Sequence, residues 1–222
     1  MNINNIGQKI VILIEKLLLI RDEDVPIHNI NEYDFLYKMQ HNYLEIKNEI
    51  QQYDNTLLKN FEDLSVEQKQ IVEAKKWKVL FLKVYGKEIE QNCISFPNTS
   101  KLITHNSIKT VMFSSLEPNT FISKHRGPYK GVLRFLLGLQ IPKENQCCVL
   151  KINNESIFWE EGKAILFDDT FEHETWNASN EKRLILFVDV ERKLKFPFNL
   201  LNKLIIRTIG LSPFIRTIYK NS

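Results

Sequence analysis

Cysteine is scarce in this chain, and the scarcity removes one way of stabilising a fold. The 222 residues include three cysteines, Cys93, Cys147 and Cys148. The number is odd, and the adjacent pair has none of the spacings that are typical of a zinc knuckle or a redox motif. We therefore expect reduced thiols, as in a cytoplasmic protein, in place of a disulfide framework.

Long hydrophobic runs are also lacking. The most apolar segment, IVILIEKLLLI at residues 10–20, is interrupted by Glu15 and Lys16. It is about half as long as a helix that crosses a bilayer, and no small-residue cleavage site follows it. The segment predicts neither a signal peptide nor a membrane span. We expect a cytoplasmic location, either free or peripheral at the inner face of a membrane.

Acidic residues are absent from the last part of the chain. From Arg192 to Ser222 there are seven basic residues and no aspartate or glutamate. Subtracting these seven charges from the formal net charge of +3 leaves −4 for residues 1–191. A basic tail on an acidic body indicates an anionic partner, such as a membrane surface. No nucleic-acid partner is expected, because the basic residues are confined to this tail and no stripe of basic and aromatic residues accompanies them.

Residues 1–90 have a mostly helical pattern and show no internal repeat. Apolar side chains recur at helical spacing from residue 6 onward. Ser65 and Gln68 resemble a capping box, so a helix is predicted to begin near Val66 and to end near Gly86. We expect this region to pack on the rest of the protein or to form a dimer surface.

Residues 91–191 contain short apolar runs that are separated by turn-forming clusters such as EPN, RGP and NASNEK. The runs are TVMFSSL, FISKH, GVLRFLLGLQIP, CCVLKIN, SIFWE, KAILFDD, HETWN and RLILFVDV. Many short strands at regular spacing are typical of an all-β sandwich or barrel. The pattern predicts a mainly β core of the double-stranded β-helix type, a cupin-like jelly roll within an α+β chain.

Residues 192–222 return to a helical pattern with a break between Gly210 and Pro213. This basic amphipathic tail has three possible roles: docking on the helical region, lying on a membrane surface, or binding another protein. Lys203 and Arg207 are predicted to lie on one side of its first helix. The apolar residues predicted on the other side are Leu200, Leu201, Leu204, Ile205 and Ile209.

Two histidines lie within the predicted strands. In the strand DTFEHETWN, alternation places Phe171, His173 and Thr175 on one face and the flanking glutamates on the other. His125 is followed by Arg-Gly, so the His-x-Asp/Glu pair that often supplies two ligands of a non-haem iron site is absent. The spacing leaves a site of two histidines without a carboxylate, unless Asp168 or Asp169 folds back from the preceding turn.

Two arginines on the predicted strands are expected to point into the interior of the β core. Alternation places Arg183 on one face with Ile185 and Phe187, and Arg134 on one face with Leu136. A buried guanidinium without a counter-ion costs several kcal/mol, so an anion should meet it. A dicarboxylate co-substrate would satisfy this need. The alternative for Arg183 is a surface ion pair with a nearby acidic residue.

These motifs, taken in order, resemble the aspartyl/asparaginyl β-hydroxylase family, which includes bacterial lipid A hydroxylases. The resemblance covers roughly residues 92–190, through FPNTSKL, FSSLEPNTFISKHRGP, LRFLLGLQIP, WEEGKAILFDDTFEHETWN and RLILFVDV. The connected series at matching spacing is far more specific than any one motif.

The resemblance implies a hydroxylase that uses Fe(II), 2-oxoglutarate and O₂ to hydroxylate an unactivated carbon of a peptide, amino-acid or lipid substrate. His125 and His173 would bind the metal without a protein carboxylate. Arg183 would pair with the distal carboxylate of 2-oxoglutarate, and Ser114 would assist it. The side chains expected on the substrate side of the pocket are those of Arg134 and Asp169.

One residue departs from the family pattern. The family motif reads Arg-x-His-Leu-Gly-Leu, whereas RFLLGL in this chain places Leu136 at the histidine that helps to hold 2-oxoglutarate. Loss of a charge-assisted hydrogen bond is worth roughly 1.5 to 3 kcal/mol, on the order of a tenfold to hundredfold loss of affinity. The alternative function is therefore a metal-binding module or pseudoenzyme on the same fold.

Overall fold

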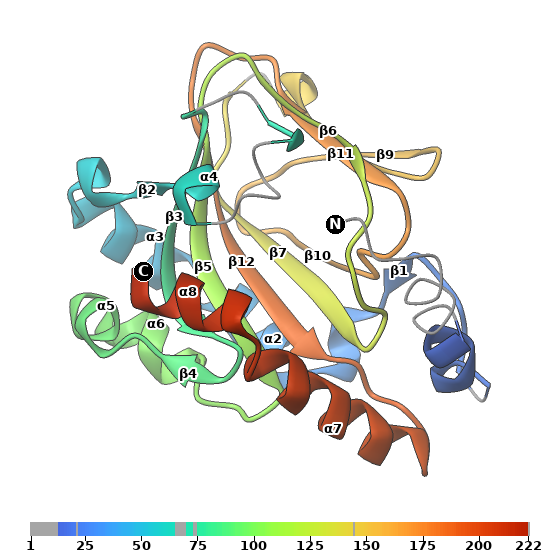
Figure 1. Ribbon diagram of the computed structural model, residues 1–222. Helices are drawn as coiled ribbons and strands as arrows, with labels where there is room; N and C mark the ends of the chain where they lie inside the picture. Colours follow the sequence, from blue (N-terminus) through green and yellow to red (C-terminus); the bar gives the residue numbers. More distant parts are fainter. Residues whose placement is uncertain (1–12, 21, 65–69, 73–74, 144, 222) are drawn as a thin grey trace.

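The computed structural model describes residues 13–20, 22–64, 70–72, 75–143 and 145–221. Within them, two antiparallel sheets face each other (Figure 1). The larger sheet contains, in spatial order, β1 (Ile27–His28), β10 (Ala164–Phe167), β7 (Val132–Gln140), β12 (Arg183–Glu191), β5 (Ile108–Leu116), β3 (Trp77–Val84) and β2 (Lys59–Asn60), with β4 (Lys87–Glu88) paired to β3. The smaller sheet contains β6 (Thr120–His125), β11 (His173–Asn177), β8 (Cys148–Ile152) and β9 (Glu155–Phe158).

The eight apolar runs of the sequence become strands β5 to β12, so the predicted jelly-roll core is confirmed. The predicted alternation is confirmed as well. Along β7, Leu136 packs into the apolar cluster between the two sheets, whereas Leu133, Phe135 and Leu137 pack on the outer face of the larger sheet. The interior that must hold any site is thus lined by one face of each strand.

Helices cover the outer face of the larger sheet. They are α2 (Asp34–His41), α3 (Tyr43–Gln52), α5 (Glu90–Ser95) and α6 (Pro97–Leu102), with α4 (Phe61–Leu64) near β2. Leu36, Met39, Ile46 and Ile50 of α2 and α3 are fully buried against the strands. The carboxylate of Glu49 accepts hydrogen bonds from the backbone N–H groups of two residues at the start of α6, which the helix itself cannot satisfy.

The predicted helix across residues 66–86 is wrong where the structure describes it. Trp77–Val84 is β3, a central strand that pairs with β5. Trp77, Val79 and Phe81 face the interior, whereas Leu80 and Leu82 face the helices. A strand that is buried on both faces is a continuous apolar run, and periodicity cannot distinguish it from a buried helix.

The remaining predictions for the N-terminal region have mixed outcomes. The capping box at Ser65 lies outside the described residues. Gly86 ends no helix; it occupies the turn between β3 and β4 with a φ of +85°, a conformation that favours glycine. Because β1 to β4 join the larger sheet, the region is not purely helical. The division of the chain at residues 90 and 191 stays a prediction.

The basic tail forms α7 (Phe198–Gly210) and α8 (Pro213–Asn221), so the predicted break between Gly210 and Pro213 is confirmed. α7 packs through Ile206, which contacts a small cluster with Leu18, Tyr129 and Leu194. The expected docking on the helical region is confirmed in part, because the buried side of α7 lies on the helical residues 13–18 as well as on the start of β7. No helix in the described ranges is long and apolar enough to cross a membrane.

Candidate active site

The two candidate metal ligands lie opposite each other on neighbouring strands. His125 ends β6 and His173 begins β11, and the two residues are paired across the strands. Their ring centres are 4.2 Å apart. A β-bulge in β6 separates Ile122 from His125 by one extra residue. Strict alternation from the buried Ile122 would direct His125 outward, and the extra residue turns it toward His173.

Both imidazoles are held in the same tautomer. The Nδ1–H of His125 donates to the backbone carbonyl of Ser123 at 2.7 Å, and that of His173 donates to the carbonyl of Phe171 at 2.9 Å. A carbonyl can only accept, so Nδ1 carries the proton in each ring and Nε2 carries the lone pair. A hydrogen bond of this kind commonly orients a histidine that binds a metal.

The environment also keeps both rings neutral. Burial lowers the pKa of His125, and it lowers the pKa of His173 to about 3 with help from the charges of His125 and Arg134. A neutral imidazole is the form that binds a metal ion. Near neutral pH the pair therefore presents two nitrogen lone pairs to the interior.

The described residues bring no carboxylate into a metal-binding group with these histidines. No group of three or more His, Cys, Asp or Glu side chains is placed to hold a metal within the described ranges. Asp168 is turned away, because its carboxylate accepts from Arg192 at 2.6 Å and from Lys130 at 3.1 Å. Asp169 is committed to Arg134 at 2.8 Å.

Arg183 is buried beside the histidines without a carboxylate partner. Its side chain is 2% exposed, and its Nη1 donates to Thr175 Oγ1 at 3.0 Å. Thr175 lies two residues beyond His173 on the same face of β11, which corresponds to about 7 Å along the strand. No ion pair to Arg183 is formed by the part of the chain that the structure describes, and its Nε has no hydrogen-bond partner there.

The desolvated guanidinium has a perturbed pKa and an aromatic neighbour. Burial lowers the pKa of Arg183 to about 10, still high enough to leave the group charged at neutral pH. The guanidinium lies over the ring of Trp159, 4.9 Å from its centroid. The alternative of a surface ion pair is wrong, because Arg183 is buried and Asp189 pairs with Arg134 instead.

Two further polar side chains line the same part of the interior. Ser114 is 1% exposed, and its hydroxyl oxygen accepts from Trp77 Nε1 at 2.9 Å. Ser114 pairs with Ile185 of β12, which lies two residues from Arg183. Because the hydroxyl oxygen of Ser114 acts as an acceptor toward Trp77, its hydrogen can still be donated to a ligand near the guanidinium. Trp159 is 5% exposed, and its Nε1–H has no partner among the described residues. Trp159 directly follows β9, outside the regular strand, so strand alternation does not predict the direction of its side chain.

Arg134 differs from Arg183 because the protein itself supplies its counter-ions. Its guanidinium contacts Asp169 at 2.8 Å and Asp189 at 3.1 Å, and it stacks 4.4 Å from the ring centroid of Phe187. The inference that Arg134 needs an external anion is therefore wrong. Asp189 shares a face of β12 with Arg183, and this alternation was the signal in the sequence for the missed partner.

Asp169 packs closely against the backbone of Gly127. Its backbone carbonyl accepts from Gly127 N at 2.6 Å, and a Cβ at Gly127 would lie 2.1 Å from the carboxyl group. Only glycine allows this approach two residues after His125. Burial raises the pKa of Asp169 to about 6 against the lowering charge of Arg134, and its Oδ1 has no partner in the described structure.

Leu136 lies on the interior face of β7, between Ile165 of β10 and Phe187 of β12. Its side chain is 5% exposed and packs in the apolar cluster between the sheets. Two residues along β7, Gly138 lies so close to the backbone oxygen of Glu160 that a Cβ would be 2.3 Å from it. This contact brings the segment with Trp159 next to the position of the missing histidine.

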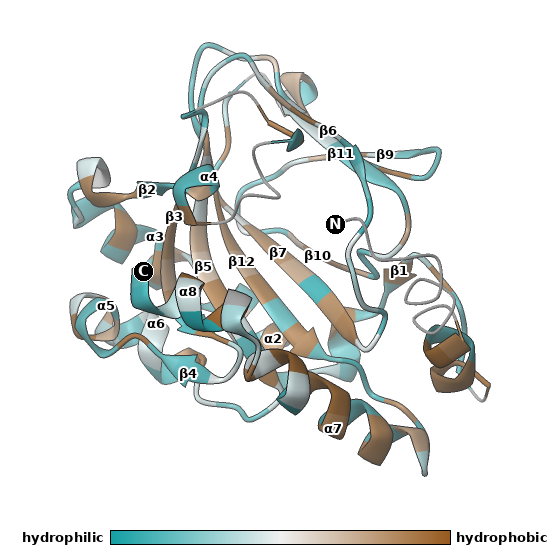
Figure 2. Ribbon diagram, viewed as in Figure 1, coloured by the Kyte–Doolittle hydropathy of each residue, from teal (hydrophilic) through white to brown (hydrophobic). Residues whose placement is uncertain are grey.

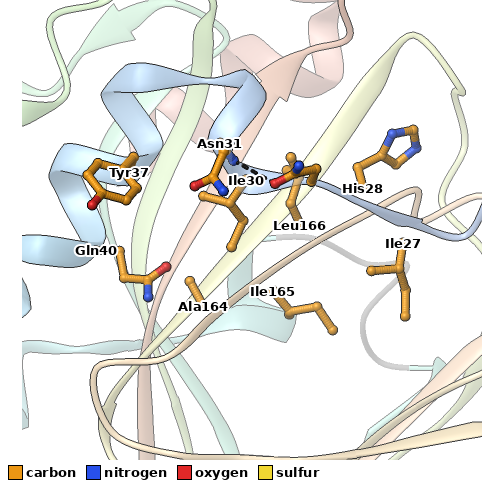
Figure 3. A pocket seen from close by; sticks show the side chains of 10 residues that line it. Ile27, His28, Ile30, Asn31, Tyr37, Gln40, Ala164, Ile165 and Leu166 are labelled. Atoms are coloured by element: carbon orange, nitrogen blue, oxygen red, sulfur yellow. Dashed lines mark hydrogen bonds between the residues drawn. The ribbon is translucent and has the colours of Figure 1, made fainter.

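A surface hollow elsewhere has none of this chemistry. It lies at the edge of the larger sheet and is lined by side chains of β1, α2, β10 and the segment between β1 and α2, among them Ile30, Tyr37 and Ile165 (Figure 3). His28 at its rim lies 3.4 Å from Arg192 through Nε2. None of the candidate site residues lines this hollow.

Comparison with known proteins identifies the family. The sequence profile of the aspartyl/asparaginyl β-hydroxylases matches residues 40–193. The chain belongs to this family. An ornithine lipid ester-linked acyl 2-hydroxylase from Rhizobium tropici is 34% identical over 194 residues, which are 86% of this chain and 69% of that enzyme.

Other members of the family match a smaller part of this β-hydroxylase homologue. The aspartyl/asparaginyl β-hydroxylases of mouse and human are 39% and 38% identical over 120 residues, which are 51% of this chain and 16% of theirs. The chain thus spans about a sixth of the length of these two relatives. The cupin domain of Schizosaccharomyces pombe Cnp3 covers 64% of this chain and 74% of that domain at 13% identity, with a TM-score of 0.39. Hydroxylation is the reaction class that the family assigns.

Proposed function

We propose that this protein is an Fe(II)- and 2-oxoglutarate-dependent dioxygenase that hydroxylates an unactivated carbon in the acyl chain of a lipid. The observation that carries the proposal is Arg183, a buried cation that has no counter-ion among the described residues and faces the same interior as two neutral histidines. A protein retains such a charge at a cost of several kcal/mol unless a ligand neutralises it. A dicarboxylate co-substrate would meet that need, and the histidines would bind a metal beside it.

The donor set fits Fe(II). The rings of His125 and His173 lie with their centres 4.2 Å apart, each with Nε2 left to bind a ligand, and imidazole nitrogen is a ligand that suits iron. When bound, Fe(II) would activate O₂ for the removal of hydrogen from the substrate carbon. The protein's own part is to keep both rings neutral and oriented before the metal binds.

The co-substrate would be held by buried donors, two of which have no partner in the described part of the chain. Arg183 Nε and Trp159 Nε1 are both such donors, and Ser114 can donate its hydroxyl hydrogen. We infer that these three groups bind the distal carboxylate of 2-oxoglutarate. Because charge-assisted hydrogen bonds are about twice as strong as neutral ones, the indole N–H would offset part of the donor lost at Leu136.

Arg134 and Asp169 would shape the substrate side of the site. Together with Asp189 they form a buried group with one cation and two carboxylates. The group holds the Asp169 carboxyl against Gly127 and so orients the turn that follows His125. Asp169 Oδ1, which has no partner in the described residues, is free to accept a hydrogen bond from a ligand.

A lipid is the proposed substrate class on two grounds. The relative from Rhizobium tropici, which matches 86% of this chain, is named for an acyl chain of a lipid, whereas the aspartyl/asparaginyl enzymes match 51%. The interior beside the histidines is lined by apolar side chains, including Leu136, Phe167 and Ile152. An acyl chain suits such a lining better than a charged peptide side chain.

Metal binding tests the first half of the proposal. Calorimetry with Co(II), a redox-stable substitute for Fe(II), should show one site in the full chain. His125→Ala and His173→Ala should each abolish it, whereas His41→Ala, which removes an exposed histidine on α2, should leave it unchanged. Equal binding by all four proteins would contradict the assignment.

Turnover tests the second half. The full chain with Fe(II), O₂ and 2-oxoglutarate should release succinate, and a lipid with a free acyl chain should accelerate the release. Absence of succinate together with absence of 2-oxoglutarate binding would reject the enzyme and favour the alternative of a metal-binding module. Leu136, which is packed among apolar side chains, is the observation behind that alternative.

The variant Leu136→His separates these two functions further. In an enzyme with a weakened co-substrate site, the restored donor should raise the affinity for 2-oxoglutarate by about tenfold or more. Leu136→Met, of similar volume and without a donor, is the matched control. A module that has lost the co-substrate site altogether would gain nothing from either change.

A further inference from the structure

The outer side of α7 is an exposed stripe in which leucines and basic residues are mixed. Leu200 and Leu204 are 56% and 62% exposed, and Leu211, just past the helix end, is 54% exposed. Lys203 and Arg207 are exposed between them. At 100° per residue, these five positions fall within about 100° of one side of the helix. We call them the α7 stripe.

The α7 stripe corrects the arrangement predicted from the sequence. Leu200 and Leu204 were predicted to lie opposite Lys203 and Arg207, but they share the exposed side with them. The buried side is formed by Asn202 and Ile206, and Asn202 is fixed through hydrogen bonds with Tyr129 and the backbone of Gly131. The polar Asn202 therefore faces the protein, and the leucines face outward.

The charge of the α7 stripe is not neutralised within the described structure. Neither Lys203 nor Arg207 forms an ion pair with any described residue. No acidic residue occurs from Arg192 to the end of the chain, whereas the preceding residues carry a net negative charge. Exposed leucines flanked by unpaired basic residues are typical of helices that lie at the surface of an anionic bilayer.

A second apolar surface lies beside the first. Leu13, Leu17 and Ile20 of the helical segment at residues 13–18 and the turn after it are 58%, 36% and 61% exposed. The segment and α7 pack on one cluster through Leu18 and Ile206. Figure 2 shows both as largely hydrophobic ribbons at the same end of the molecule.

This end of the molecule is connected to the candidate metal site. Glu15, 7% exposed on the segment 13–18, accepts hydrogen bonds from Arg126 at 3.1 and 3.2 Å. Arg126 directly follows His125 and also donates to the backbone oxygen of Thr170. The ion pair between Glu15 and Arg126 therefore links this end of the molecule to His125, a proposed ligand of the metal.

We propose that the α7 stripe, with the exposed apolar side of residues 13–20, docks on an anionic lipid bilayer. The leucines would enter the interfacial region, and Lys203 and Arg207 would reach the phosphates from the same side of the helix. The inference deepens the proposed function, on which it rests for the substrate class, by naming the surface where a lipid is met. A bilayer is the proposed partner because the exposed charges of the α7 stripe are all positive and the exposed leucines lie between them.

Vesicle co-sedimentation of the full chain tests the docking without iron or turnover. The protein should sediment with vesicles of equal parts phosphatidylcholine and phosphatidylglycerol, and far less with vesicles of phosphatidylcholine alone. High salt should weaken the binding. Lys203→Gln with Arg207→Gln should weaken it by about fivefold for each charge removed, and Leu200→Ser with Leu204→Ser should weaken it at least as much.

The control removes exposed apolar side chains from another surface. Leu44→Ser with Ile94→Ser changes side chains that are 55% and 78% exposed on α3 and α5, and it should leave vesicle binding unchanged. All the changed residues are exposed, so the thermal unfolding of each variant should match that of the unchanged chain. If the double variant Leu200→Ser with Leu204→Ser unfolds at a lower temperature, the single variant Leu204→Ser takes its place.

Three results would overturn the inference. One is equal vesicle binding by the unchanged chain and by the leucine variant. Another is equal binding to neutral and anionic vesicles. The third is a concentration-dependent dimer that the leucine variant loses while vesicle binding is absent, which would make the stripe a contact between copies. Succinate release with no vesicle binding would reject the docking alone, and vesicle binding without metal binding would reject the proposed function alone.

Discussion

The interior between the two sheets contains two arginines, the buried Arg183 and the partly buried Arg134, and the side chains around them differ. Arg134 is surrounded by Asp169 and Asp189, and it stacks on Phe187. Arg183 has a threonine hydroxyl, the face of Trp159 and no carboxylate in the described structure. The guanidiniums belong to adjacent strands of one sheet, so the difference lies in the side chains around them.

The contrast separates an internal ion cluster from a ligand site. A charge whose partners are built into the fold is there in every state of the folded protein, and its removal strands those partners. A charge without partners is costly until a ligand arrives, so its removal should harm binding more than folding. Four predictions test this contrast, in order of decreasing expected effect.

Arg134→Gln should reduce the free energy of unfolding by about 3 kcal/mol, because it leaves the buried carboxylate of Asp169 and the partly buried carboxylate of Asp189 without a cation. Urea unfolding followed by circular dichroism measures the change. Lys124→Gln, which removes a partner of Glu172 in an exposed ion pair, is the control and should cost under about 1 kcal/mol. A loss as small as that of the control would show that Arg134 has no such role.

Arg183→Gln should weaken the binding of 2-oxoglutarate by about a hundredfold, because the change removes the only proposed cation at its distal carboxylate. The free energy of unfolding should change by under about 1 kcal/mol, since no carboxylate is stranded. Calorimetry and urea unfolding give the two values. Arg216→Gln on α8 is the exposed control, and unchanged affinity in Arg183→Gln would remove the basis of the proposed co-substrate site.

Trp159→Phe should weaken 2-oxoglutarate binding by about tenfold, because it removes one donor to a charged oxygen and keeps the ring beneath Arg183. Binding followed by calorimetry, with the iron left out, distinguishes this effect from a loss of metal. The matched control is Trp176→Phe, at a half-buried ring that contacts Phe121. Equal affinities in the two variants would leave Trp159 with a packing role only.

The smallest expected effect concerns Asp168 and acid. Burial raises the pKa of Asp168, but hydrogen bonds from Thr170 and the charges of Arg192 and Lys130 outweigh burial, so the pKa lies below its usual range. A carboxylate with a lowered pKa stabilises the fold above its unfolded pKa near 4, and this contribution is lost as the pH falls through the folded pKa. The free energy of unfolding should therefore fall on acidification below pH ~4.

The variant Asp168→Asn isolates this slope. Its free energy of unfolding should be lower at neutral pH, because Arg192 loses its buried partner, and it should depend less on pH in the acid range. Urea unfolding at a series of pH values provides both quantities. An unchanged acid slope would assign the pH dependence to other carboxylates.

The prediction of the fold succeeded where periodicity is unambiguous. The runs from TVMFSSL to RLILFVDV alternate or are bounded by turn residues, and all of them are strands. The run WKVLFLKV failed because β3 is buried on both faces by clusters that belong to distant parts of the chain. No local pattern reports that the sheet continues past β5.

In the candidate site, too, the residues on regular strands could be predicted, and those placed by irregular or distant contacts could not. The alternation of Arg183 and His173 was predictable, because each lies on a regular strand with one interior face. The inward direction of His125 depends on an extra residue in β6, and a bulge has no reliable signature in a single sequence. Of the two counter-ions of Arg134, Asp189 could have been found from its alternation with Arg183 on β12. Asp169 lies in the turn after β10, so only the tertiary structure places it beside Arg134.

By itself, the sequence determined the strands β5 to β12, the family resemblance, the identity of the candidate ligands and the basic charge of the tail, because these depend on residue types and local spacing. The tertiary structure decided which buried charge is already paired, which donors remain without partners and which side of α7 is exposed. Those properties depend on contacts between segments far apart in the chain. Hydrogen bonding and desolvation depend on which groups lie close together in space, and the local sequence does not specify this.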